Sequence, residues 1–121
     1  MKIRLGDLRR LIQEAMESNK VVAYHGGSMP IRKFDRSKTV DGTFWFSEDV
    51  DKILRGESGA ASVKWLMKVE LDVSNVAGWE EYDRYMLDQI EDMGYDAIHL
   101  DDDWILFDPA RIRVLEVTKV S

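Results

Sequence analysis

Apolar residues recur along the chain with two periods, which separate expected helices from expected strands. Between residues 5 and 16 they return every three or four positions with polar residues between them, the pattern of an amphipathic helix that ends at Asn19-Lys20. The same spacing predicts a second helix from Trp79 to Met93, closed by Gly94. We expect one apolar stripe of this helix to pack into the core: Trp79, Tyr82, Met86, Ile90 and Met93.

Strands are expected where apolar residues alternate with charged ones or form short runs rich in aromatic and β-branched residues. Residues 63–71 alternate, which predicts a half-exposed strand. Short apolar runs predict further strands at 21–24, 43–46, 95–100, 104–107 and 112–117. The first of these runs stops at His25-Gly26-Gly27. Because strand neighbours face opposite sides, Phe44, Trp45 and Phe46 cannot all point inward.

The connecting segments are polar, and two of them carry local signals. Residues 28–41 predict an irregular loop that Ile31 and Phe34 hold against the core. Ser47 is suited to be the N-cap of a short helix that ends near Arg55. Three consecutive aspartates, 101–103, predict a tight acidic turn between two strands.

The order of these elements favours an α+β fold. A helix is followed by two strands, a helix, a strand, a helix and two or three more strands, with few crossovers and several expected hairpins. The 121 residues, of which 45% are hydrophobic, suit one domain spanning 1–121 with a substantial core.

Composition excludes several functions. The chain has no cysteine, so disulfides, thiolate nucleophiles and cysteine metal sites are absent. A net charge of −6 argues against a nucleic-acid coat, although a local basic patch is compatible with it. Residues 1–18 lack the pattern of a signal peptide, and no window is apolar enough to span a membrane. We therefore expect a soluble, cytoplasmic protein.

The residues that could carry chemistry have ordinary structural interpretations as well. His25, taken alone, is interpreted most simply as a strand-end histidine bonded to nearby backbone, and His99 is expected to be structural. The Asp101–Asp103 turn fits a solvated hairpin, a functional acid or, less well, a divalent-cation site. A metal-dependent hydrolase built on this turn and His25 is the least favoured function.

Three motifs in this order resemble the ADP-ribosyltransferase superfamily. They are a strand ending in Tyr24-His25-Gly26, a Gly-x-x-x-Phe-Ser segment ending at Ser47, and a C-terminal stretch from Gly94 to Ile112 with Asp103 before Phe107-Asp108-Pro109. More narrowly, the chain is similar to small His-type transferases of phage and mobile-element proteins. The resemblance spans about residues 21–117.

The resemblance implies a split β-core whose cleft holds NAD. His25, next to Tyr24, would hydrogen-bond the adenosine ribose, and a neutral imidazole offers one donor and one acceptor for this. Gly26 would grip the nicotinamide carboxamide through its backbone, since the absent Cβ lets a ligand approach closely. Phe46 and Ser47 would line the nicotinamide site.

The family acid, usually Glu, corresponds to Asp103, with Asp102 and Asp101 as alternatives if the turn shifts by one residue. It would contact the nicotinamide ribose and stabilise an oxocarbenium-like transition state. Aspartate is one methylene shorter than glutamate. The aromatic residue that the family uses to stack on nicotinamide is absent near Gly56. The candidates to replace it are Trp45, Tyr82 and Tyr85.

The expected function is therefore mono-ADP-ribosyl transfer from NAD to an acceptor, favoured to be a protein, with release of nicotinamide. The phage-like resemblance implies an effector in a host cytoplasm. The alternative is a non-catalytic module of the same fold that binds NAD or a protein partner.

Overall fold

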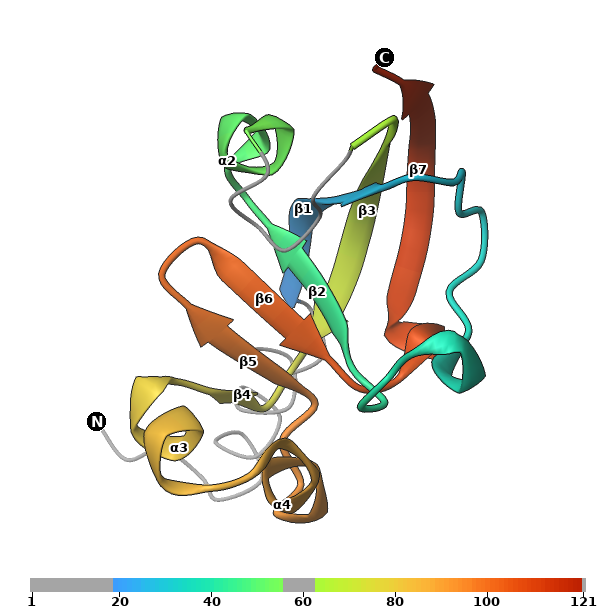
Figure 1. Ribbon diagram of the computed structural model, residues 1–121. Coiled ribbons are helices and arrows are strands. Elements are labelled where there is room, and N and C mark those ends of the chain that lie inside the picture. The colour runs from blue at the N-terminus through green and yellow to red at the C-terminus, as the bar shows by residue number, and fades with distance from the viewer. Residues whose placement is uncertain (1–18, 56–62, 121) are drawn as a thin grey trace, which may run out of the picture.

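The computed structural model describes residues 19–55 and 63–120 (Figure 1). The predicted helix over residues 5–16 and the segment around Gly56 lie outside the described residues. Among the described residues, no helix has the length and apolar character that a membrane crossing requires.

The fold is α+β, and its described residues form one seven-stranded sheet and three short α-helices (Figure 1). The strand order is β4-β5-β6-β2-β1-β3-β7, and β4–β5 is the parallel pair. The strands are β1 (Asn19–Gly27), β2 (Phe44–Ser47), β3 (Trp65–Val73), β4 (Val76–Ala77), β5 (Ala97–Leu100), β6 (Asp103–Leu106) and β7 (Ile112–Lys119).

The sheet is nearly divided between β1 and β2. All nine residues of β1 pair with β3, whereas β1 pairs with β2 through Tyr24 and Ser47 alone. Strand β2 then pairs along its whole length with β6. Beyond Tyr24 the two strands diverge, which leaves a gap between the end of β1 and the first residues of β2. We call this gap the split.

Two apolar cores cover the sheet. The larger lies over β1, β2, β3 and β6 and includes Phe34, which holds the 28–41 loop as predicted. The smaller gathers the alternate residues of β5 and β6 against α4, around Ile98, Ile105 and Ile90. The alternation of β6 explains the division, because neighbouring strand residues face opposite sides. Trp45 is the exposed member of Phe44-Trp45-Phe46, as strand geometry requires.

The first strand is longer than the sequence indicated. Asn19 and Lys20 do not end a helix but pair with Val73 and Asp72 of β3, and the strand continues through His25 to Gly27. Pairing with a long neighbour imposes extended backbone on residues whose own strand preference is low.

The helices also differ from the prediction. α2 (Val50–Leu54) is capped by Asp49, whose side chain accepts a hydrogen bond from the Lys52 amide. Ser47 is not the N-cap: it ends β2, and its buried hydroxyl accepts a hydrogen bond from the Asp49 amide. The helix ends before Arg55, as predicted.

The single helix expected over 79–93 is two helices, α3 (Trp79–Arg84) and α4 (Leu87–Asp92). Tyr85 and Met86 between them have extended backbone, and the Met86 amide donates to the Gln89 side chain, which starts the second helix. The expected buried stripe is therefore wrong. Ile90 is fully buried and Tyr82 partly so, but the break leaves three members largely exposed: Trp79, Met86 and Met93.

Candidate functional site

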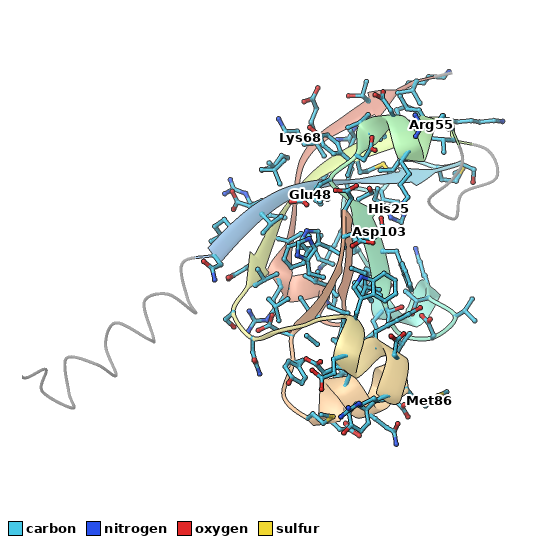
Figure 2. The ribbon with its side chains drawn as sticks, turned by 90° about the vertical axis from the view of Figure 1, so that its left-hand side faces the viewer. His25, Glu48, Arg55, Lys68, Met86 and Asp103 are labelled. Carbon is cyan, nitrogen blue, oxygen red and sulfur yellow. The ribbon has the colours of Figure 1, made fainter. Side chains whose placement is uncertain are left out.

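Three of the predicted site residues, Tyr24, Ser47 and Asp103, meet where β1, β2 and β6 join. Tyr24 pairs with Ser47, and Ser47 pairs with Asp103. Directly paired residues of neighbouring strands point to the same face, so these three side chains form one row. His25, the next residue of β1, turns toward the other face. Figure 2 shows His25 and Asp103 in the same region of the molecule, below α2.

The His25 ring occupies the split. Its Nδ1 lies 2.7 Å from the carbonyl oxygen of Trp45, and its ring contacts the edges and faces of Phe34 and Phe46 with centroids 5.3 and 5.7 Å away. A carbonyl accepts hydrogen bonds, so Nδ1 carries the proton and Nε2 is the acceptor in the neutral ring. Burial lowers the pKa of His25, and the hydrogen bond to Trp45 only partly opposes this. The side chain is therefore neutral at pH 7.

This burial predicts a pH-dependent stability. As the pH falls through about 6.5, the unfolded chain protonates this histidine while the folded chain resists, so the free energy of unfolding decreases. We expect the urea midpoint of the wild type to fall more than that of His25→Gln between about pH 7.5 and about pH 5.5. An equal change in urea midpoint with pH for the wild type and His25→Gln would contradict the assignment of this pH dependence to His25.

A pocket of about 570 Å³ lies between His25, the first residues of β2 and the 28–41 loop. This volume is within the range of small-molecule sites, about 300–1,000 Å³. Besides His25, its lining residues include three cations, two carboxylates and three aromatic residues: Arg32, Lys33, Lys38, Asp35, Asp41, Phe34, Phe44 and Trp45. Asp103 does not line it. The pocket is net positive in a chain of net charge −6, which favours an anionic ligand.

Trp45 connects the pocket to the acidic side of the site. It lines the pocket with His25, and it lies two residues before Ser47 on β2. Alternation therefore places Trp45 on the same face as Ser47 and Asp103. Trp45 and Asp103 are diagonal neighbours on adjacent strands, and residues in this relation are about 7–8 Å apart. Trp45 is thus a pocket-lining residue of β2 that lies on the Asp103 face.

Asp103 is the first residue of β6 and is held by a lysine. Lys52 of α2 donates to both carboxylate oxygens, at 3.1 and 3.0 Å, and this hydrogen bond is the largest reason why the pKa of Lys52 is raised. The pair is half-buried, with side-chain exposures of 28% for Lys52 and 22% for Asp103. The carboxylate is thus held in position by a cationic partner.

Asp102 and Asp101, the two alternatives to Asp103 as the functional acid, differ from it in position. Asp102 is exposed, and its carbonyl accepts a hydrogen bond from the Glu48 amide at 2.8 Å, so its backbone joins the turn to the end of β2. Asp101 has a φ of 57°, a conformation that aspartate tolerates in tight turns. Its carboxylate lies 3.4 Å from the indole nitrogen of Trp79, away from β2. Of the three, Asp103 is the one in register with Ser47.

Gly26 has a structural role that the sequence did not show. A Cβ built on Gly26 would lie 2.5 Å from Cγ2 of Ile53 in α2 and 3.1 Å from Cγ2 of Val63. The space left by the missing side chain is therefore filled by Ile53, not left open for a ligand as we expected. Contact through the Gly26 backbone stays a prediction.

Two further residues of the site were missed by sequence reasoning. Lys52 meets Asp103 across 51 positions of sequence, and nothing local indicates this pair. Glu48 lies 3.6 Å from His99 Nε2, while the His99 ring stacks on Trp104 with a centroid distance of 4.0 Å. The stacking supports the structural role expected for His99. Figure 2 shows Glu48 near His25 and Asp103.

Within residues 19–55 and 63–120, no three His, Asp or Glu side chains gather in a group that could hold a metal ion. Comparison of the chain with known proteins found no matching family model, no matching curated protein and no matching solved structure.

Proposed function

We propose that the protein is a mono-ADP-ribosyltransferase that binds NAD in the pocket beside His25. The observation that carries this proposal is the position of Trp45, which lines that pocket and also shares a face with Asp103. Tyr24, Ser47 and Asp103 lie in one row, and His25 follows Tyr24 on the opposite face, although the motifs are far apart in sequence. The near-division of the sheet at β1–β2 supports the split core that the family resemblance implies.

The pocket suits a dinucleotide. His25 offers a neutral ring whose Nε2 can accept a hydrogen bond from a ribose hydroxyl. The three cations of the pocket, Arg32, Lys33 and Lys38, would balance the charge of a diphosphate. Trp45 would supply the aromatic surface for nicotinamide. The other two candidates fit less well, because Tyr82 packs against the smaller core and Tyr85 lines a separate groove.

In the proposed reaction the bond between the ribose anomeric carbon and nicotinamide breaks, and its electron pair leaves with neutral nicotinamide. The acceptor nucleophile donates a lone pair to that carbon and loses a proton. Asp103 would stabilise the positive charge that develops on the ribose. Lys52 fixes the orientation of this carboxylate but also reduces its negative field. We propose a protein acceptor and a host-cytoplasmic effector role, from the family resemblance.

The test is release of nicotinamide from labelled NAD, with and without candidate acceptor proteins. We expect Asp103→Asn to lower turnover about 100-fold, because it removes the charge opposite the transition state. His25→Ala should weaken NAD binding about tenfold, the loss of one hydrogen bond of about 1.4 kcal/mol.

Matched controls separate these effects from general damage. Asp92→Asn and Asp83→Asn, which change exposed carboxylates on α4 and α3, should leave turnover and NAD affinity near wild type. Full turnover in both Asp103→Asn and His25→Ala would refute the proposed assignment.

The Lys52–Asp103 ion pair favours a second function, a non-catalytic module that binds NAD or a protein. A carboxylate with both oxygens bound to a lysine is weakened as an electrostatic catalyst. Lys52→Met distinguishes the two. In a transferase it should change turnover while NAD still binds; in a binding module, calorimetry should detect NAD or partner binding with no nicotinamide release from either protein.

A further inference from the structure

The break between α3 and α4 produces an exposed apolar surface far from the pocket. Tyr85, Met86 and Met93 are 41%, 70% and 48% exposed, and we call these three residues the α3–α4 surface. Beside it lies a groove of about 250 Å³, lined by Glu80, Glu81, Arg84, Tyr85, Met93 and Tyr95. Figure 2 shows Met86 at the end of the molecule remote from His25 and Asp103.

These side chains are of the kinds found at binding surfaces. Neighbouring exposed apolar residues with a polar rim mark interaction sites, and Tyr and Met are enriched in them. Methionine is unbranched and polarisable, so Met86 and Met93 can adapt to the shape of a partner. The break between the two helices leaves Tyr85 and Met86 exposed instead of packed in the core.

Glu80 and Glu81 line the groove, and the two helices around it are strongly acidic. Residues 79–93 contain six carboxylates and one cation, Arg84. Arg84 lies 3.5 Å from Glu80, and Glu91 is bound by Arg36. In the part of the chain that the structure describes, no cation is within ion-pair distance of the other four: Glu81, Asp83, Asp88 and Asp92. Their charge is available to an incoming partner.

We propose that the α3–α4 surface docks a basic, amphipathic segment of a partner protein. Apolar side chains of the segment would pack on Tyr85, Met86 and Met93, and its Lys and Arg side chains would face the four free carboxylates. The charge argues against other occupants. Anionic lipid and nucleic acid would be repelled, and a second copy placed symmetrically on the same surface would bring the acidic helices of one copy against those of the other.

The experiment uses the full chain and two synthetic peptides of leucine and lysine with identical composition. In one peptide the leucines follow helical spacing, and in the other the order is shuffled. We expect fluorescence anisotropy to show at least about tenfold tighter binding of the amphipathic peptide, weakened by added salt. The variant Met86→Ser with Met93→Ser should lose about tenfold in affinity.

The matched control is Val22→Ser with Leu115→Ser, which changes two apolar residues that are similarly exposed on β1 and β7. It should bind the amphipathic peptide like the wild type, and circular dichroism should show all variants folded. Equal binding of the two peptides, or no effect of the Met86 and Met93 changes, would overturn the proposal. Displacement of the bound peptide by a synthetic 1–18 peptide would also overturn it, because the surface would then bind a segment of the same chain. Self-association that the methionine variant abolishes would overturn it too, because the surface would then bind a second copy of the chain. No part of this test depends on NAD turnover.

Discussion

Asp96→Ala is expected to lower the free energy of unfolding by about 3 kcal/mol, which corresponds to a fall of about 10 °C in Tm. The Asp96 carboxylate, just before β5, accepts hydrogen bonds from the Ser74 hydroxyl at 2.6 Å, the Asn75 amide at 2.8 Å and the Ser74 amide at 3.1 Å. Arg111 lies 3.7 Å away. The side chain is only 12% exposed, so water cannot readily replace it.

The size of the effect follows from what the substitution leaves behind. Two backbone amides and a hydroxyl at the β3–β4 connection would lose their acceptor, and each unsatisfied buried group costs about 1–3 kcal/mol. Differential scanning calorimetry measures the change. Ser74→Ala, which removes one of the three donors, should cost about 1 kcal/mol. Asp83→Asn, an exposed carboxylate on α3, is the control and should be neutral. A wild-type Tm for Asp96→Ala would show that the network does not stabilise the fold.

Gly26→Ala is expected to destabilise the protein by about 1–3 kcal/mol through overpacking. The new methyl group would lie 2.5 Å from Cγ2 of Ile53, closer than packed carbon atoms approach, so α2 or β1 would have to shift. Because α2 also carries Lys52, a shift of the helix would disturb the Asp103 carboxylate. The stability effect and the site are therefore linked by one contact.

A double-mutant cycle isolates this contact. In an Ile53→Ala background, Gly26→Ala should cost much less, because the opposing methyl group is gone and the 3.1 Å approach to Val63 remains. Gly27→Ala is the matched control, since a Cβ there meets its nearest neighbour at an ordinary 3.6 Å. Urea denaturation measures all four proteins. A cost for Gly26→Ala that persists unchanged without the Ile53 side chain would contradict steric conflict as the cause.

The sequence predicted the elements whose pattern is local. The alternation over 63–71 became β3, the acidic turn became the β5–β6 connection, and Gly94, with a φ of 96°, follows α4 as expected. Asn19 and Lys20 were misassigned because their strand conformation comes from pairing with β3. The helix break at Tyr85-Met86 was missed because apolar spacing continues across it.

The sequence indicated which residues are candidates for the site, but not how their side chains contact one another. Motif order indicated Tyr24, Ser47 and Asp103, and the strand register shows in addition that these three lie in one row. Sequence could not show that Lys52 binds Asp103 or that Ile53 fills the space beside Gly26, because both contacts depend on where α2 packs. Such contacts arise from tertiary structure and leave no periodic signal in the chain.

Because β1 and β2 pair through one residue of each strand, the sheet consists of two smaller sheets that are joined at this pair. Backbone hydrogen bonds resist shear in an ordinary sheet, but here the aromatic packing of His25, Phe34 and Phe46 must supply that resistance. A molecule held in the pocket would touch both smaller sheets at once. Its affinity and the rigidity of the whole sheet would then be thermodynamically coupled, each strengthening the other.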